Sequence, residues 1–347
     1  MNRIALVQTQ SKAAAWLAVA EVFAVYSVGA VLGLLLAKLC GVSLSNPLAA
    51  IAEHPQQDLI PIAFDLAQLL FWQYLGWFLC IGLMRLLRGP LPETRDTRPR
   101  PHWRGLLGLG LAAGCVAALP ARLLFVVNDW LHLGDTAPWR AALLDAPWDF
   151  DFWVLMAVGS FALIPFVEEM FYRGYVLKRL NASMRTGSAL MLGAALFAFS
   201  HAQYLHFDAL NLITLASVVF SGLVYGVVVV YARSLWPAIL AHAMINVPAS
   251  TAMNLVIALT MAVYLVITWT QWRPLRDYSR TTFAGERIGH LLAMALVGGA
   301  LAFAFHATQE LALLAGALLT LMMLGGYRWY LRRLIRQGDH HDVAVHA

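Results

Sequence analysis

Apolar runs of about twenty residues recur along almost the whole chain, and they constrain the fold more than any other feature. Of the 347 residues, 61% are hydrophobic and 12% are charged. A helix of about 20 apolar residues is long enough to cross the hydrocarbon core of a bilayer. The sequence therefore predicts an all-α, polytopic transmembrane helical bundle with about ten spans. The predicted spans are 13–37, 59–84, 104–127, 152–172, 187–204, 210–231, 235–248, 251–270, 288–306 and 310–327.

Short basic segments between the apolar runs orient these spans. Segment 85–104 is rich in arginine and proline, and an excess of basic residues marks a cytoplasmic loop. Counting crossings from it places the acidic segment 128–151 outside, whereas the basic residues of 178–185, 273–287 and 332–336 fall inside. The sequence therefore predicts a multi-pass protein of the cell inner membrane with both termini in the cytoplasm.

The predicted spans divide into three parts. Residues 1–150 form N-terminal transmembrane helices, with the cytoplasmic linker 85–104 between two of them. Residues 151–250 carry most of the ionisable groups that lie within apolar segments. Residues 251–347 form C-terminal transmembrane helices and a cytoplasmic tail.

The charge and cysteine content exclude two common classes of protein. The formal net charge is +5, but the basic residues lie between apolar runs, where they anchor a membrane face. Nucleic acid is therefore not an expected partner. The three cysteines have no CxxC spacing and lie in or beside apolar stretches, so they predict neither a disulfide framework nor a zinc site.

The stretch FVEEMFYRGY, residues 166–175, places two carboxylates and a guanidinium within an apolar segment. An ionised side chain near the bilayer centre costs on the order of 2.5–3.5 kcal/mol, so it needs a partner or a function. Glu169 and Arg173 are four residues apart and share a helix face, which predicts an ion pair. Glu168 lies about 100° further round the helix and lacks this partner. An apolar setting favours its neutral form and Arg173 its ionised form, so its strength as a general base stays open.

Two more pairs of side chains occur on later apolar segments at the same spacing. Phe197 and His201 share a helix face in FAFSH, and His242 and Asn246 share one in HAMIN. Alone, an intramembrane His followed by Asn is more typical of an interhelical hydrogen bond than of a catalyst. Three such patterns in one chain favour a functional site.

The motifs E-E-x-x-x-R, F-x-x-x-H and H-x-x-x-N are complete and occur in this order between about residues 150 and 250. In this respect the chain resembles the CPBP family, the CAAX prenyl endopeptidases and their bacterial relatives, including bacteriocin-processing homologues. The resemblance implies intramembrane peptide hydrolysis, with residues 151–250 as the catalytic core.

The resemblance also implies a role for each motif residue. Glu168 and His201 would activate a water molecule, while His242 and Asn246 would stabilise the oxyanion. The orienting pair would be Glu169 and Arg173. The helical geometry independently leaves Glu168 as the free carboxylate, so the two arguments agree.

Metal dependence has two readings at this site. Glu168, His201 and His242 provide the carboxylate and two imidazoles that a catalytic zinc accepts. The H-E-x-x-H pattern of zinc peptidases is absent, however, and Asn246 is a poor zinc ligand. We therefore expect glutamate chemistry with no cofactor, and zinc is the alternative.

Helical rise gives an expected depth for the site. Glu168 and His242 lie ~15 Å and ~14 Å from the basic residues that end their segments, whereas His201 lies ~24 Å from Arg185. The first two values agree, and they predict a site below the cytoplasmic surface that is reached from that side. His201 is too deep for this arrangement unless its helix tilts or begins late.

Two other ionisable residues have structural interpretations. Glu21 is expected to form an interhelical hydrogen bond or to lie at the end of a span. Arg122 is expected to extend its guanidinium to the membrane interface.

The function predicted from these observations is an endopeptidase that cuts a membrane-embedded or membrane-associated protein or peptide, in contact with the lipid bilayer. The alternative is a proton-coupled transporter, because buried Glu and His side chains also relay protons. Paired halves typical of transporters are not evident in residues 1–150 and 251–347. A catalytically silent membrane scaffold is disfavoured because every motif position is intact.

Overall fold

The computed structural model describes residues 12–42, 50–52, 58–89, 91, 101–135, 138–205 and 208–307, and the regular structure within them is helical throughout. The predicted all-α bundle is therefore confirmed for this part of the chain. The predicted span 310–327 lies outside the described residues. In chain order the longer helices are α1 (Lys12–Leu39), α3 (Leu59–Arg88), α4 (Trp103–Leu131), α9 (Thr186–Phe199), α10 (Ala209–Ala232), α11 (Trp236–Ile245), α12 (Thr251–Ile267), α13 (Arg273–Phe283) and α14 (Ile288–Ala307).

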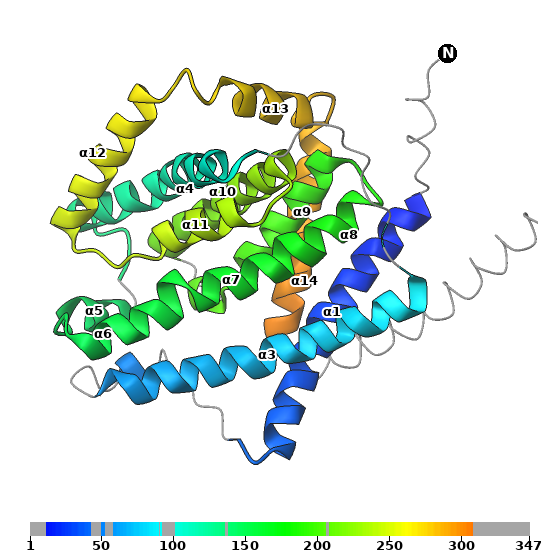
Figure 1. The fold of residues 1–347 in the computed structure, drawn as a ribbon, viewed down its shortest axis with the longest axis horizontal. Coiled ribbons are helices and arrows are strands. Elements are labelled where there is room, and N and C mark those ends of the chain that lie inside the picture. Colours follow the sequence, from blue (N-terminus) through cyan, green and yellow to red (C-terminus); the bar gives the residue numbers. More distant parts are fainter. Residues whose placement is uncertain are drawn as a thin grey trace, which may run out of the picture.

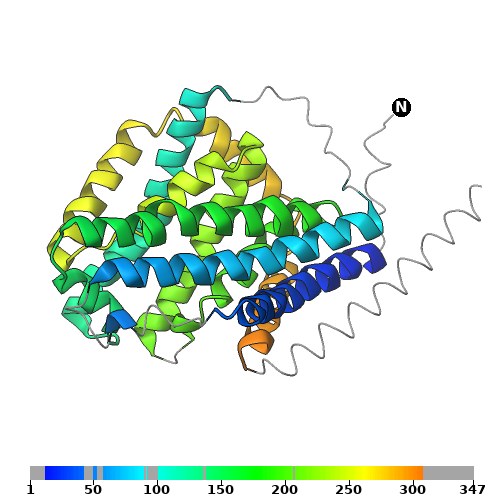
Figure 2. The ribbon, with the colours of Figure 1, turned by 60° about the horizontal axis from the view of Figure 1, so that its bottom comes forward.

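Between α4 and α9 the chain forms a continuous helical stretch, Phe150–Asn181. It consists of α6 (Phe150–Met156), α7 (Leu163–Glu169) and α8 (Lys178–Asn181), which are linked by two π-helical segments, Ala157–Phe161 and Met170–Leu177. The short helix α5 (Pro138–Asp145) precedes it. In Figure 1 this stretch crosses the middle of the molecule, with α4, α10 and α11 on one side and α1 and α3 on the other. Figure 2 shows α3 running alongside it.

Five of the described helices are long and apolar enough to cross a membrane, and a sixth span is possible if the bent pair α13 and α14 counts as one. The five are Ala14–Leu39, Leu59–Arg88, Trp103–Leu131, Phe150–Asn181 and Ala209–Ala232. Helices α9, α11 and α12 are apolar but shorter. The protein is thus a multi-pass membrane protein by helix length and composition.

Helices α1 and α3 approach each other backbone to backbone. A methyl group added at Gly76 would lie 2.0 Å from the carbonyl oxygen of Gly29, and one at Gly33 would lie 2.2 Å from that of Trp72. Small residues allow membrane helices to pack this closely, and van der Waals contact then stabilises the pair. The Trp77 indole donates across the same contact to the carbonyl of Tyr26 at 2.9 Å.

A buried ion cluster ties this pair to the end of the Phe150–Asn181 helix. Glu21 of α1 is fully buried. Its Oε1 accepts from Arg88 Nε at 2.9 Å and from the Tyr175 hydroxyl at 3.0 Å, and its Oε2 accepts from Arg179 Nε. The predicted interhelical contact of Glu21 is confirmed, and its partners include two arginines and a tyrosine from two other helices. We call these four residues the basic-end cluster.

Candidate active site

The helix that carries Glu168 and Glu169 departs from regular α-helical geometry on both sides of them. The N–H of Ala162 donates to the carbonyl of Ala157, five residues back, at 3.0 Å. This wide turn ends just before Pro165, which has no N–H to donate. A second π-helical segment, Met170–Leu177, follows the glutamates directly. π-helical segments are rare in proteins, and those that occur often lie at functional sites.

Glu169 is the buried, anchored carboxylate of the pair. It is fully buried, and its Oε1 accepts from Arg173 Nη1 at 2.8 Å. The other terminal nitrogen of Arg173 donates to the carbonyl of Gly222 in α10 at 3.1 Å, and its guanidinium lies 4.4 Å from the ring centroid of Phe197. The predicted ion pair of Glu169 and Arg173 is confirmed, and it joins the glutamate helix to α9 and α10.

His242 of α11 lies between the two carboxylates. Its Nδ1 is 2.9 Å from Glu169 Oε1, and its Nε2 is 3.8 Å from Glu168 Oε2. Since an ionised carboxylate only accepts, the Nδ1 atom carries a proton and Nε2 faces Glu168. The sequence did not predict the contact with Glu169, because 73 positions separate the two residues and no local pattern reports such a distance.

His201 lies just beyond the end of α9, and its imidazole is also fixed through Nδ1. This atom lies 2.8 Å from the carbonyl oxygen of Phe197, which can only accept, so Nδ1 is the donor and Nε2 is left for another contact. The ring stacks on Tyr204, with centroids 6.2 Å apart. The four-residue spacing of Phe197 and His201 thus allows the imidazole to bind the Phe197 carbonyl in the turn that ends α9.

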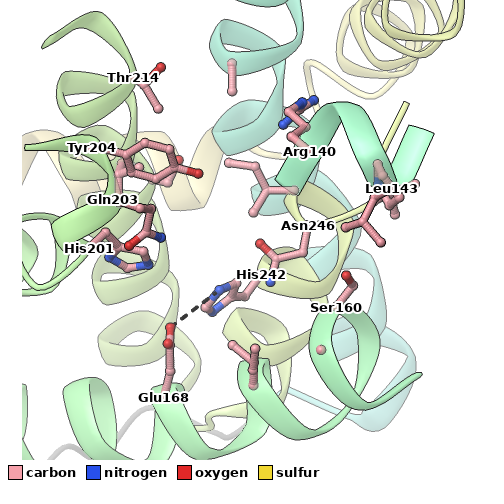
Figure 3. Close-up of a pocket in the computed structure, with 18 of the residues that line it drawn as sticks. Arg140, Leu143, Ser160, Glu168, His201, Gln203, Tyr204, Thr214, His242 and Asn246 are labelled. Atoms are coloured by element: carbon pink, nitrogen blue, oxygen red, sulfur yellow. Dashed lines mark ion pairs between the residues drawn. The ribbon is translucent and has the colours of Figure 1, made fainter. Parts of the chain in front are cut away.

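Asn246 ends α11. Its backbone N–H donates to the carbonyl of His242 at 3.3 Å, which keeps the two residues on consecutive turns. Figure 3 shows the Asn246 amide beside the His242 ring, with Glu168 and His201 across from them.

The four predicted catalytic side chains line one cavity of about 360 Å³. Glu168 comes from α7, His201 from the turn after α9, and His242 and Asn246 from the end of α11. Among the described residues, the Oε2 atom of Glu168 is buried and has no hydrogen-bond partner. The cavity therefore holds one carboxylate oxygen that is free to bind and two imidazoles that are held in place from behind.

The cavity extends away from the basic end of the bundle. Its lining continues to Arg140 and Leu143 of α5 and to Gln203, Val247 and Pro248. These residues belong to the end that carries the acidic segment 128–151. The lining therefore extends toward the end opposite the basic clusters, and the predicted access from the basic side stays a prediction. His201 lies just beyond the end of α9, which begins at Thr186, so the larger distance expected from helical rise is retained.

Two residues at that end have altered acidity. Burial lowers the pKa of the Arg140 guanidinium from its ordinary value. Burial also raises the pKa of the Tyr204 phenol, and the positive charge of Arg140 opposes that rise.

Arg122 of α4 supports α11 from outside the cavity. It is 3% exposed, so the expectation that it reaches the membrane interface is wrong. Its Nη2 donates to the carbonyls of Met244 and Ile245 at 3.1 and 3.2 Å, and its Nη1 donates to Asn254 Oδ1 at 3.0 Å. These contacts satisfy and neutralise carbonyl groups at the C-terminal end of α11, which Asn246 caps. No local pattern predicts these contacts, because two backbone carbonyls and one side-chain amide more than a hundred residues away are the partners.

The zinc alternative does not fit this arrangement. Within the described ranges, no three His, Cys, Asp or Glu side chains lie close enough together to hold a metal ion. Glu168, His201 and His242 share the cavity without forming such a group.

A comparison with protein families identifies the segment that contains these residues. Residues 150–248 match the family described as type II CAAX prenyl endopeptidase Rce1-like. Over this segment the chain is similar to the CAAX prenyl endopeptidases. This family consists of peptidases, and the matched segment includes every residue of the three motifs. Neither a curated protein nor a solved structure matches the chain.

Proposed function

We propose that the protein is an intramembrane endopeptidase that hydrolyses a peptide bond of a membrane-embedded or membrane-associated protein. The observation that carries the proposal is the free Glu168 oxygen in a cavity shared with His201, His242 and Asn246. The CAAX endopeptidase domain over residues 150–248 supports the peptidase over the proton-coupled transporter.

Glu168 and His201 bind and activate the attacking water. The carboxylate oxygen of Glu168 accepts one proton as the water oxygen bonds to the scissile carbonyl carbon. His201, with Nδ1–H committed to Phe197, offers Nε2 as an acceptor that orients the same water. When the C–N bond breaks, Glu168 returns the proton to the leaving amine. The products are a new carboxyl terminus and a new amino terminus.

His242 and Asn246 stabilise the negative charge that develops on the carbonyl oxygen. The side-chain amide of Asn246 donates one hydrogen bond. His242 donates from Nε2 only when both ring nitrogens are protonated, because Nδ1–H is directed to Glu169. The carboxylate of Glu169 balances that positive charge, as the acid behind the histidine does in a catalytic triad. Glu169 thus has an electrostatic role toward His242 besides its ion pair with Arg173.

Membrane orientation belongs to the same proposal. About ten spans, with both termini in the cytoplasm of a cell with an inner membrane, agree with the excess of basic residues in the short loops. With that orientation the Arg140 end of the cavity faces the extracytoplasmic side. Reporter fusions at the linker 85–104 and at the segment 128–151 test it: alkaline phosphatase should be active only in the acidic segment.

Cleavage of a peptide library by the purified protein tests the function. In detergent micelles, the wild type should cut internally quenched peptides with apolar sequences, and Glu168→Gln should not. A chelator should leave the rate unchanged. Equal rates for the wild type and Glu168→Gln would refute the catalytic assignment.

A further inference from the structure

Helix α13 lies at the end of the bundle that carries the basic segments, and it is outside the matched segment 150–248. A bend of 90° separates it from α14. Figure 1 shows it at the edge of the molecule, between α12 and α14. The Tyr278 ring lies 5.4 Å from the ring of Tyr231, near the end of α10 at Ala232. Since α10 is long enough to cross a bilayer, α13 lies where that span leaves the hydrocarbon core.

The face of α13 that points away from the bundle is basic. At 100° per residue, Arg273, Arg276 and Arg280 lie within an arc of about 60°. Tyr278, which packs against the core, lies on the opposite side. The one acidic residue of this helix, Asp277, lies 3.7 Å from Arg273 in an exposed pair. The face therefore keeps a net positive charge, and we call its three arginines the basic face.

Two tryptophans lie beside the basic face. Trp269 is exposed, and the Arg276 Cζ atom lies 3.9 Å from its ring centroid, a cation–π contact. Arg276 also donates from Nη1 to the Trp269 carbonyl. The Trp272 indole donates to the Thr268 hydroxyl at 2.9 Å. Tryptophan is enriched at the interface between membrane and water, so these rings indicate that the arginines beside them lie among lipid headgroups.

The acidic residue that follows α13 is bound to α9. The Glu286 side chain is 3% exposed, and its Oε1 accepts from the Ser188 hydroxyl of α9 at 3.2 Å. Arg185, which precedes α9, donates from Nη1 to the carbonyl of Gly285 at 2.9 Å. These contacts hold the end of α13 against α9 and leave the positive charge of the basic face in place.

We propose that the basic face of α13 binds the headgroups of anionic phospholipids in the surrounding bilayer. The planar guanidinium groups match phosphate oxygens, and an anionic leaflet attracts basic groups that lie beside a membrane span. An acidic protein surface offers similar charge, but Trp269 and Trp272 favour a lipid partner because indole rings lie at headgroup depth. This binding site is independent of peptide hydrolysis.

Binding of labelled lipids to the full-length protein tests the proposal. Dansyl-labelled phosphatidylglycerol and phosphatidylcholine are titrated separately into the protein in neutral detergent micelles, and energy transfer from tryptophan reports binding. The wild type should bind phosphatidylglycerol ~10–100-fold more tightly, since each basic side chain contributes a factor of about 5 at an anionic surface. The triple variant Arg273→Gln, Arg276→Gln, Arg280→Gln should bind the two lipids equally. Salt at ~1 M should also remove the preference.

A matched variant separates a defined site from general charge attraction. Arg85→Gln, Arg104→Gln, Lys178→Gln removes three exposed positive charges elsewhere at the basic end, and it should retain the preference for phosphatidylglycerol. An equal loss of preference in both triple variants would overturn the proposal, as would a wild type that binds the two lipids alike. If the α13 triple variant does not fold, the double variant Arg273→Gln, Arg280→Gln changes only exposed side chains, and its preference should fall ~5–25-fold.

Competition and unfolding measurements distinguish the possible partners. Polyglutamate or inorganic phosphate should not displace the labelled phosphatidylglycerol. Displacement by polyglutamate would assign the basic face to an acidic protein, displacement by phosphate would assign it to a free anion, and either result would overturn the proposal. Unlabelled phosphatidylglycerol should raise the unfolding temperature of the wild type and not that of the α13 triple variant, because a ligand of the folded state stabilises it. An equal rise in both proteins would contradict binding at α13.

Discussion

Two regions of the bundle contain buried glutamates, and their surroundings are opposite. In the basic-end cluster, both oxygens of Glu21 accept from charged or hydroxyl donors on two other helices. At the cavity, the Oε2 atom of Glu168 has no donor among the described residues, and its neighbour His242 lies 3.8 Å away. Glu21 is fully buried, whereas the Glu168 side chain is 18% exposed and keeps a buried, unused oxygen in the cavity.

This difference separates a structural charge from a functional one. A fully hydrogen-bonded ion cluster fixes which helices meet, and losing one partner exposes the others to an apolar interior. A carboxylate with a free oxygen contributes little to packing and stays available to bind water. Glu169 lies between the two cases, since it anchors Arg173 and also contacts His242.

Replacing Glu168 should have the largest effect on the rate. Glu168→Gln keeps the size of the side chain but removes the proton acceptor, so kcat should fall ~10²–10⁴-fold. Thermal unfolding in detergent should not change, because the free oxygen makes no hydrogen bond. Initial rates on the internally quenched apolar peptides, with unfolding followed by circular dichroism, measure both quantities. Unfolding at a lower temperature would place Glu168 with the structural carboxylates.

Replacing Glu169 should affect both rate and stability. Glu169→Gln weakens the bond to Arg173 and removes the negative charge behind His242, so kcat should fall ~10–100-fold, the value of a hydrogen bond to a charged group. The unfolding temperature should fall as well, since Arg173 is left buried without its counter-ion. A rate loss without destabilisation would show that the ion pair is not needed for folding.

Replacing Arg122 should lower kcat with little change in KM. Arg122→Lys keeps a positive charge but cannot donate to Met244, Ile245 and Asn254 together, so the end of α11 should move and kcat should fall ~3–10-fold. Arg122 does not line the cavity, so substrate affinity should be retained. Steady-state kinetics separate the two constants, and a rise in KM alone would contradict this role.

Replacing Glu21 should have the smallest effect on rate. Glu21→Gln removes the negative charge that Arg88 and Arg179 share in the basic-end cluster, and the free energy of unfolding should fall by about 3–5 kcal/mol. Activity per folded molecule should be unchanged, because the cluster lies outside the cavity lining. Unfolding in a denaturing detergent, with activity normalised to the folded fraction, tests this. A rate loss like that of Glu168→Gln would remove the distinction between the two regions.

Local spacing in the sequence predicted part of this site. The i, i+4 spacing predicted the ion pair of Glu169 with Arg173 and left Glu168 without this partner. The three motifs, taken in order, predicted the four side chains that line the cavity. Apolar run length predicted the helices, but α9 and α11 are shorter than the apolar runs 187–204 and 235–248, since a run of apolar residues does not show where a helix ends.

Contacts between distant segments could not be predicted in the same way. The link from His242 to Glu169, the contacts of Arg122 with α11 and the position of Arg140 in the cavity depend on helix packing. The extension of the cavity toward Arg140 and Leu143 of α5 also depends on packing.

The most direct test is an experimental structure of Glu168→Gln with an uncleaved peptide bound in the cavity. The scissile carbonyl carbon should lie beside the substituted side chain, with its oxygen toward His242 and Asn246. A peptide bound with its carbonyl groups remote from His242 and Asn246, or outside this cavity, would contradict the account.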